Sequence, residues 1–352
     1  MHKYQFFMES KKSVTFLYTN MPQAHAQFAE AINAKSIPIS RSMGKLKYIL
    51  NPIRAILAAR KIPEDSKFVL IDSFLPVIPK MLGLMKGKKL IMLVATPWPF
   101  YLKFKRRPLN PIIRYLANKV DAYIPVSDMI RRLIIETLGF DENLVRTVNP
   151  VPSKSMYNSQ IKIKPKLKSN NILFIAAGQR KRIKERIDSK GLALTIEAFK
   201  KARPKIKDLK LIIVGKWPQN VINEYTSDGV HWLGNVTETE KNKAMEDSSI
   251  YVSIANGDPF PVSVVEACLA GLPTIVSEYT GVESLIKQIK KDFVVPVDTD
   301  IAADRIIQYF NLSINKRRQL SKRTRRFAKK LSVENARKDF KSAFGRLAIN
   351  LR

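Results

Sequence analysis

The most informative stretch of the chain is residues 258–277, which read DPFPVSVVEACLAGLPTIVS. Two carboxylates in it, Asp258 and Glu266, stand eight positions apart, the first on a turn bounded by prolines and the second inside an amphipathic run. Gly271 and Pro273 end that run, as such residues commonly end helices, and a short apolar strand follows. The stretch predicts a loop, a helix and a strand, with one acid on the loop and the other in the first turns of the helix.

Apolar runs of strand length alternate with longer runs of helical period on both sides of this stretch. Such alternation is typical of α/β proteins with parallel sheets. The predicted strands lie at 14–18, 68–71, 90–95, 122–126 and 144–148 in the first half, and at 172–176, 209–214, 231–233, 250–254, 274–276 and 293–296 in the second. We therefore predict two doubly wound, Rossmann-like domains.

The length of 352 residues exceeds the size at which one hydrophobic core stops growing, so two domains are expected. The rhythm of strands and helices breaks between residues 150 and 170, where prolines and lysines predict an extended, charged linker. The predicted parts are a first domain over residues 1–155, a basic linker over 156–170, a second domain over 171–331, and a last helix over 332–352.

The composition is that of a globular protein, with 45% hydrophobic residues, and it argues against disorder. The single cysteine, Cys268, excludes an intramolecular disulfide and suits a reducing compartment; a small buried apolar side chain is its expected role. No clean apolar span of about 20 residues occurs, and the first residues lack the apolar core of a signal peptide. These features predict a cytoplasmic protein.

The net charge of +32 attracts anions in general, whether nucleic acid, anionic lipid or phosphorylated small molecules. Solvated basic faces without a partner explain much of such a charge as well. The lysines and arginines gather in three clusters, at residues 103–107, 162–207 and 316–330.

The order Asp258, Glu266 and then Ala-x-x-x-Gly-x-Pro resembles the signature of the retaining glycosyltransferases of family 4, also described as glycosyl transferases group 1. The resemblance is strongest over residues 171–347 and thinner in the first half. It implies the GT-B fold, in which two Rossmann-like domains face a cleft and the last helix crosses back to the first domain. It also implies an enzyme that takes its sugar from a nucleotide-diphosphate sugar bound mostly to the second domain.

The segment Ser189-Lys190-Gly191 resembles the Lys-Gly element of this family, in which the lysine and an upstream arginine clamp the donor diphosphate. A phosphate at a helix N-terminus also meets free backbone N–H groups. We favour Arg180, which follows Gly178 soon after a strand, as the partner of Lys190. The basic loop is longer than usual, so Arg182 and Arg186 compete for that role.

The resemblance assigns the ribose of the donor to Glu266 and its sugar to Asp258. Asp258 stands where the family has a glutamate and is one methylene shorter, which shortens its reach by about 1.5 Å. Pro261 suits the start of a helix, and the N–H groups of Val262 and Ser263 are expected to face the donor phosphates. The donor-binding set is completed by residues of the same loops: Phe260, Pro261, Val262, Ser263 and Gly178.

No metal site is expected, because three histidines, one cysteine and no paired acidic spacing supply no ligand set. No Gly-x-Gly-x-x-Gly follows the first strand and no Walker-type loop occurs, so NAD and ATP fit poorly. The nucleotide sugar is then the co-substrate, and no cofactor is predicted.

The predicted reaction is the retaining transfer of a sugar, hexosyltransferase-like, to a hydroxyl of a saccharide or lipid-linked acceptor. The basic clusters and an amphipathic stretch at residues 45–61 suggest docking at an anionic membrane on its inner face, although Pro52 is expected to break or kink that stretch. His25 is expected on a helix surface.

Two rival interpretations stay open. A nucleic-acid-binding protein on a degenerate GT-B scaffold fits the charge, but no recognised reading module supports it. An inactive donor-binding partner of another transferase fits the missing glycines after the first strand and the shortened acid at Asp258. Which sugar, nucleotide and acceptor are used, and the oligomeric state, are beyond the sequence.

Overall fold

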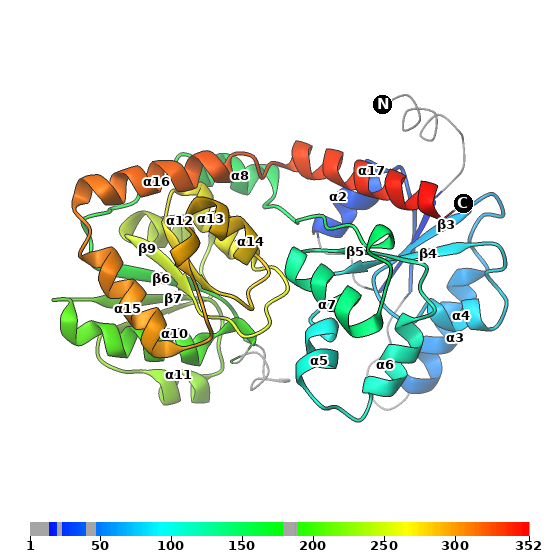
Figure 1. Cartoon of the computed structure of the whole chain (residues 1–352), viewed down its shortest axis with the longest axis horizontal. Coiled ribbons are helices and arrows are strands. Elements are labelled where there is room, and N and C mark those ends of the chain that lie inside the picture. The colour runs from blue at the N-terminus through cyan, green and yellow to red at the C-terminus, as the bar shows by residue number, and fades with distance from the viewer. Residues whose placement is uncertain (1–13, 20–22, 40–46, 179–186, 188, 352) are drawn as a thin grey trace. The chain divides into compact units, whose positions relative to one another are not determined.

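The computed structural model describes residues 14–19, 23–39, 47–178, 187 and 189–351. The chain divides into two compact units. Unit 1 comprises Met1–Pro150 and Val333–Arg352, and unit 2 comprises Val151–Ser332. Each unit is a parallel sheet wrapped by helices (Figure 1).

Unit 1 contains a five-stranded parallel sheet in the order β2-β1-β3-β4-β5. Its strands are β1 (Val14–Tyr18), β2 (Lys35–Pro38), β3 (Phe68–Ile71), β4 (Lys89–Val94) and β5 (Ala122–Pro125). Its helices before the chain leaves the unit are α2 (Gln23–Ala31), α3 (Lys47–Ala59), α4 (Val77–Met81), α5 (Trp98–Phe104), α6 (Asn110–Ala117) and α7 (Asp128–Leu138). Strands β3 and β5 are buried throughout, so the sheet forms the core of the unit.

The strands of unit 1 depart from the prediction at two places. The strand predicted at 144–148 is replaced by a short 3-10 helix, η1 (Glu142–Leu144), and a single bridge between Val145 and Tyr123. Strand β2 was not predicted, because three of its four residues are exposed and only Ile37 is buried, so it has no apolar run. Helix α3 continues through Pro52, so the break that we considered at this residue does not occur.

The last helix, α17 (Val333–Asn350), belongs to unit 1 although it follows unit 2 in the chain. Phe340 of α17 stacks on Phe28 of α2 with ring centroids 4.6 Å apart, and Phe344 meets Phe68 edge to face at 5.8 Å. Figure 1 shows α17 and α2 together on one side of the sheet and α3, α4 and α6 on the other. The return of the last helix to the first domain is therefore confirmed.

Unit 2 contains a six-stranded parallel sheet in the order β11-β10-β9-β6-β7-β8. The strands are β6 (Asn171–Ile175), β7 (Lys210–Val214), β8 (Val230–Gly234), β9 (Ile250–Ser253), β10 (Thr274–Ser277) and β11 (Val294–Val295). The helices are α8 (Lys154–Gln160), α10 (Leu192–Ala202), α11 (Gln219–Tyr225), α12 (Glu238–Asp247), α13 (Val262–Leu269), α14 (Glu283–Ile289), α15 (Thr299–Phe310) and α16 (Ile314–Ala328). All six strands predicted for this half are present.

The strand order of unit 2 reverses next to β6. From β6 the chain proceeds to β7 and β8 on one side, and it then crosses to β9, β10 and β11 on the other. In open α/β sheets, ligands bind outside the carboxyl ends of the strands at such a reversal. A ligand site is therefore expected at the carboxyl ends of β6 and β9.

The segment that we expected to be an extended linker is attached to unit 2. Residues 154–160 form α8. The backbone N–H of Lys166 donates to the carbonyl of Glu246 at 2.7 Å, and the carbonyl of Leu167 accepts from the Arg317 guanidinium at 3.0 Å. These bonds hold the later part of the segment to unit 2, so it differs from the extended linker that its prolines and lysines predicted.

Candidate functional site

The loop that follows β9 carries Asp258, and backbone bonds fix this loop to the one that follows β10. Asp258 forms a parallel bridge with Thr280, and its carbonyl accepts from the N–H of Gly281 at 2.8 Å. The N–H of Gly257 donates to the carbonyl of Tyr279 at 3.1 Å. The carboxylate of Asp258 is consequently held in a buried position at the carboxyl edge of the sheet.

Lys190 meets Asp258, and the backbone next to it explains why. Lys190 Nζ lies 2.7 Å from Asp258 Oδ2. The following residue, Gly191, has a φ of +73° and lies so close to the end of β9 that a Cβ there would be 2.0 Å from the carbonyl oxygen of Ile254. The hydroxyl of Thr195 also accepts from the N–H of Ile254 at 3.0 Å. Only glycine permits this close approach, which brings Lys190 to the acid.

Helix α13 begins between the two acids, and its first turn is fastened to the sheet. Pro261 is the N-cap residue, with extended backbone, and both Pro261 and Phe260 are buried. The Ser263 hydroxyl lies 3.0 Å from the Tyr251 hydroxyl and donates to the carbonyl of Ile175 at the end of β6, at 3.2 Å. The first N–H groups of a helix have no acceptor within it, so the turn at Val262 offers donors at the carboxyl edge of the sheet.

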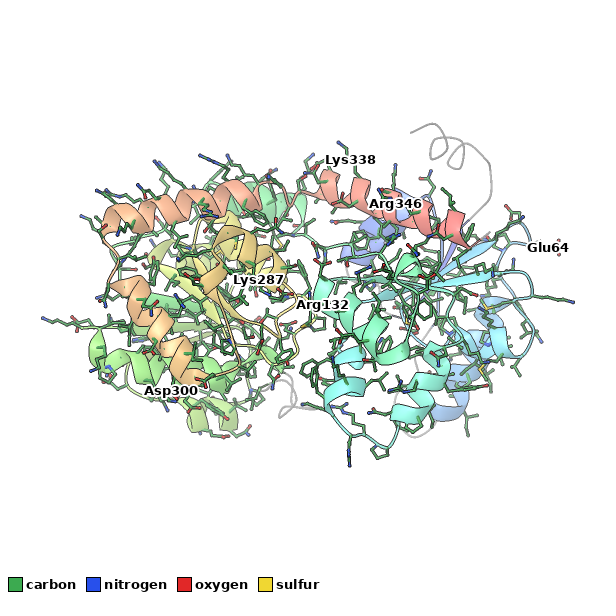
Figure 2. The ribbon with its side chains drawn as sticks, in the orientation of Figure 1. Glu64, Arg132, Lys287, Asp300, Lys338 and Arg346 are labelled. Atoms are coloured by element: carbon green, nitrogen blue, oxygen red, sulfur yellow. The ribbon has the colours of Figure 1, made fainter. Side chains whose placement is uncertain are left out.

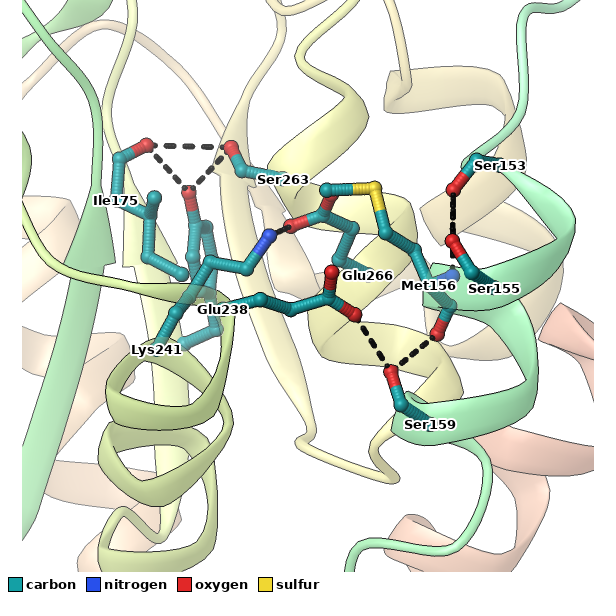
Figure 3. Close-up of polar contacts among 10 residues, drawn as sticks. Ser153, Ser155, Met156, Ser159, Ile175, Glu238, Lys241, Ser263 and Glu266 are labelled. Carbon is teal, nitrogen blue, oxygen red and sulfur yellow. Dashed lines mark hydrogen bonds and ion pairs between the residues drawn. The ribbon is translucent and has the colours of Figure 1, made fainter.

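Glu266, on the next turn of α13, is paired with a lysine that we did not predict to be in the site. Lys241 Nζ of α12 lies 2.9 Å from Glu266 Oε2, and the two side chains are only 14% and 7% exposed. Figure 3 shows Lys241 reaching from α12 to the Glu266 carboxylate. The site thus contains two acids, and each is bound to its own lysine.

Lys241 had a recognisable signal in the sequence. The buried residues of α12 are Ala244 and Met245, three and four positions after Lys241. Residues with that spacing share one helix face, so Lys241 occupies the inward face of a helix that is otherwise polar. A lysine at such a position needs an acidic partner.

The remaining predicted residue of the described part, Gly178, lies in a loop at the carboxyl edge of the sheet. Gly178 follows β6, is buried, and donates its N–H to the carbonyl of Lys216 at 3.0 Å, while Gly215 after β7 packs against the carbonyl of Ala176 so closely that a Cβ would lie 1.9 Å from it. These loops therefore lie together at the carboxyl edge. Arg180 and its two competitors, Arg182 and Arg186, lie outside the described residues.

Tyr251 lies near both acids and remains protonated. Burial raises the pKa of Tyr251 well above its usual value, and the nearby charges of Asp258 and Glu266 raise it further, against the opposing effect of its hydrogen bonds to Ser263 and Ile175. A neutral phenol can donate to a carbonyl, and this one bonds Ile175 at 3.2 Å. Burial likewise raises the pKa of the Cys268 thiol to about 12, so no reactive thiolate forms there.

Among the described residues, neither a metal-type cluster nor the cavity of about 620 Å³ marks this site. No group of three or more His, Cys, Asp or Glu side chains in that part of the chain is arranged to hold a metal ion. A cavity of about 620 Å³ lies beside α12 near the amino ends of β6 and β7, and none of Lys190, Lys241, Asp258 or Glu266 lines it. The site at the carboxyl edge of unit 2 is therefore identified by its residues and their geometry.

Comparison with known proteins decides the family. Residues 182–327 match the model of the glycosyl transferases group 1, and residues 11–151 match the model of glycosyltransferase family 4. The chain belongs to the glycosyltransferases of this family. The group 1 model covers most of unit 2 of this glycosyltransferase, and the family 4 model covers nearly all of the first part of unit 1.

The curated relatives of this glycosyltransferase are mycobacterial. It is 26% identical over 191 residues to phosphatidyl-myo-inositol mannosyltransferase of Mycolicibacterium smegmatis, which is 53% of this chain and 47% of the relative. It is 25% identical over 202 residues to the enzyme of that name from Mycobacterium leprae, or 56% and 51%. The chain therefore spans about half the length of the curated relatives it matches.

Solved structures confirm the fold of this glycosyltransferase. The crystal structure of Anabaena HepE in complex with UDP and glucose matches 93% of this chain and 98% of its own, with a TM-score of 0.67 and 15% identity. Sucrose-phosphate synthase from Thermosynechococcus elongatus matches 97% and 100%, with a TM-score of 0.72 and 13% identity. The GT-B fold expected from the sequence is confirmed.

The surface of both units is strongly basic. Figure 2 labels Lys287 on α14, which pairs with the buried Glu283 at 2.9 Å, and Lys338 and Arg346, which are exposed on α17. Helix α16 contains no acidic residue and exposes a run of cationic side chains: Lys316, Arg318, Lys322, Arg323 and Arg326. No helix of the described residues is long and apolar enough to cross a membrane.

Proposed function

We propose that this glycosyltransferase moves a sugar, with retention of configuration, from a nucleotide-diphosphate sugar to a hydroxyl of a saccharide or lipid-linked acceptor. The observation that carries the proposal is the arrangement at the carboxyl edge of unit 2. Asp258 and Glu266, each bound to a lysine, stand on either side of the first turn of α13 where β6 and β9 end.

Lys190 and the start of α13 hold the donor diphosphate in this proposal. The lysine supplies a positive charge, and the N–H groups of Val262 and Ser263 supply donors at a helix N-terminus, where anions bind well. As the bond to the sugar breaks, negative charge grows on the diphosphate, and these fixed groups stabilise it. Arg180 is the second cation of the proposal, and Gly178, Phe260 and Pro261 belong to the loops around the donor.

The two acids take the uncharged parts of the donor. Glu266 accepts the vicinal hydroxyls of the ribose, because a carboxylate has two oxygens and only accepts hydrogen bonds. Asp258 orients the transferred sugar. In the structure its carboxylate is bound to Lys190 at 2.7 Å, so the donor enters a site in which the acid and the cation already stand side by side.

The chemical step follows from the family resemblance. The acceptor hydroxyl attacks the anomeric carbon on the face that the diphosphate leaves, and its proton passes to a phosphate oxygen of the departing group. No covalent bond to a carboxylate is needed, in contrast to retaining glycosidases with two flanking acids. Lys190 and the N–H groups of α13 neutralise the diphosphate, and the proposal includes no metal ion and no cofactor.

A thermal-shift screen tests the donor site. UDP, GDP, ADP and their sugar conjugates are added to the wild type and to Glu266→Gln. A nucleotide present at 100 times its Kd stabilises the fold by about 2.7 kcal/mol. We expect one nucleotide class to stabilise the wild type and to do so less in the variant, while the exposed Glu224→Gln on α11 behaves like the wild type.

The reaction itself is tested with the nucleotide sugar that the screen selects. Released nucleoside diphosphate and the anomeric configuration of the product are measured by NMR. A product with inverted configuration would overturn retention, and a wild type that no nucleotide stabilises would overturn the donor site as a whole.

We further propose that unit 1 works at the cytoplasmic face of an anionic membrane, where a lipid-linked acceptor is found. Helix α3 exposes Ile49, Ile53 and Leu57, which are 63%, 47% and 49% exposed. Their spacing of four puts them on one helix face, and Arg60 and Lys61 are exposed at its end. An apolar face with flanking cations is the signature of an interfacial helix. The mycobacterial relatives are named for an acceptor with a lipid.

Vesicle sedimentation tests the membrane face. The chain is mixed with phosphatidylcholine vesicles with and without phosphatidylserine, at low and high salt. Burying an isoleucine or leucine side chain is worth about 1.5–3 kcal/mol, so Ile53→Gln with Leu57→Gln weakens binding by about 100-fold or more. Ile301→Gln, which changes an exposed isoleucine of unit 2, is the matched control. Equal binding by both variants would refute this use of α3.

A further inference from the structure

Lys241 is the one member of the site to which neither the sequence nor the family resemblance gave a part. Its ammonium lies 2.9 Å from Glu266 Oε2, at a place where both side chains are nearly enclosed. An ion pair this far from water is strong only when its geometry is good, and loss of one partner leaves an uncompensated charge. The position of the Glu266 carboxylate therefore depends on Lys241.

The helix that carries Lys241 is itself held in place at its start. Thr237 and Glu240 form a capping box, in which the Glu240 carboxylate accepts from the N–H of Thr237 at 2.7 Å. Glu238 accepts from the Ser159 hydroxyl of α8 at 2.9 Å (Figure 3). Lys241 comes one residue after the box, so its backbone is fixed at both the cap and the α8 contact.

The contact uses one of the two carboxylate oxygens. Lys241 Nζ meets Oε2 of Glu266, and an ionised carboxylate has about four lone-pair sites on its two oxygens. The lysine can thus fix the plane of the carboxylate while sites remain for two neighbouring hydroxyls. A carboxylate that is fixed before the ligand arrives loses less rotational freedom on binding.

We propose that Lys241 is a positioning residue that sets the selectivity of the site for ribose over deoxyribose, by holding the Glu266 carboxylate where it accepts the 2′- and 3′-hydroxyls. This inference rests on the proposed function, since it requires a nucleotide whose ribose meets Glu266. It adds that recognition of the ribose is shared between α12 and α13, and that the ion pair between them is the part that orients it.

The test compares ribonucleotides with deoxyribonucleotides. Dissociation constants are measured by calorimetry for UDP, GDP and ADP and for their 2′-deoxy forms, with the wild type, Lys241→Met and Lys241→Arg. A hydrogen bond to a charged group is worth enough to make the wild type prefer the ribonucleotide about 10- to 150-fold. In Lys241→Met we expect the ribonucleotide to bind nearly as weakly as the deoxyribonucleotide, whose own affinity changes less than about 3-fold. Lys241→Arg keeps the charge and restores part of the preference.

Two controls separate positioning from support of the fold. Lys243→Met changes an exposed lysine of the same helix, which pairs with Glu246 and Asp247, and leaves both affinities unchanged. Lys241→Met with Glu266→Gln removes the buried charge that the single variant strands, so this double variant folds even where the single one does not. It shows no more loss of ribose preference than Glu266→Gln alone.

Each outcome decides something different. An equal loss of ribonucleotide and deoxyribonucleotide affinity in Lys241→Met assigns the lysine to the fold and overturns the inference, as does an unchanged preference. A wild type that binds nucleotides without preference for ribose overturns the role of Glu266 as well. A wild type that binds no nucleotide overturns the proposed function.

Discussion

The two units are built alike, from a parallel sheet and its helices, but they distribute charged and apolar side chains in opposite ways. Unit 2 buries carboxylates at Asp258, Glu266 and Glu283, whereas the described part of unit 1 buries no Asp, Glu, Lys or Arg. Among the described residues, unit 1 exposes large apolar side chains on α3, α4, α6 and the segments between them, and unit 2 exposes only Leu233 and Ile301.

This difference indicates that the two units have different tasks, although their folds are alike. Burying charges is costly unless each has a partner, and exposed apolar patches usually mark contact surfaces. In unit 2 the buried carboxylates are paired with lysines, and in unit 1 the exposed apolar side chains lie on helix faces. The comparison supports donor chemistry in unit 2 and a contact surface on unit 1.

The largest expected effect concerns whether the units are independent. Phe340→Ala removes the ring that stacks on Phe28, at 4.6 Å, in the core of unit 1. Truncation of a buried phenylalanine costs about 3–5 kcal/mol. Hydrogen exchange followed by mass spectrometry should show loss of protection in α2 and α17 and none in β6 and β9. Lys338→Ala on the exposed face of α17 should change neither, and loss of protection in both units would end the view of them as separate.

Glycines with similar φ in the two units give the second prediction. Gly191 in unit 2 and Gly139 in unit 1 have φ of +73° and +64°, but a Cβ at Gly139 meets nothing within 4 Å. Alanine at either position pays the left-handed penalty of about 1–2 kcal/mol. Gly191→Ala must in addition displace the backbone at Ile254, so it should cost more and should abolish nucleotide binding. Equal melting temperatures for the two variants would contradict this.

Helix caps give a smaller effect. The Thr237 hydroxyl caps α12 in unit 2 and the Ser127 hydroxyl caps α7 in unit 1. Alanine at either position should cost about 0.5–2 kcal/mol in denaturant unfolding. Only Thr237→Ala loosens the helix of Lys241, so only this variant should also weaken nucleotide binding. Thr239→Ala, which changes an exposed neighbour on α12, is the control. Weaker nucleotide binding by Ser127→Ala would argue against the division of tasks between the units.

The smallest expected effect is a pH dependence peculiar to unit 1. Burial lowers the pKa of His25 below its usual value, although the charge of Asp72 opposes the shift. The unfolded chain therefore takes up the proton first, so the stability from neutral His25 is present above about pH 6.5 and is lost as the pH falls through the lowered value. In unit 2 the N–H groups of Ile301 and Asp300 lower the pKa of Asp298, which costs stability only in stronger acid.

Hydrogen exchange at pH 7.5 and pH 5 measures this difference. Protection of β1 and α2 should decrease at pH 5 more than protection of unit 2, and His25→Gln should remove the decrease. A decrease of the same size in His25→Gln would assign the pH dependence to other groups.

The sequence predicted the strands and the main motif because both depend on neighbours in the chain. Strands β1 and β3 match their predicted ranges, since an apolar run bounded by polar residues is a local signal. Strand β2 has no such run and was missed. His25, expected on a helix surface, is buried, because its ring faces the sheet and meets Phe16 of β1 edge to face at 6.4 Å.

The ion pairs of the site depend on residues that are distant in sequence. Lys190 and Asp258 are separated by 68 positions, and Lys241 and Glu266 by 25. Nothing in the local pattern says which lysine meets which acid, because that choice is made by the register of the strands and by the close approach at Gly191. The inward position of Lys241 on α12 was visible, but its partner was not.

The place of α17 has a consequence for how the protein is made. A ribosome completes the sheet of unit 1 early, yet the helix that covers Phe28 and Phe68 emerges only after all of unit 2 has been synthesised. At about 5–20 residues per second, that interval lasts roughly 10–40 s. During it one side of the first sheet awaits its cover while the second sheet can close, so the half of the molecule that is translated first is the half that finishes folding last.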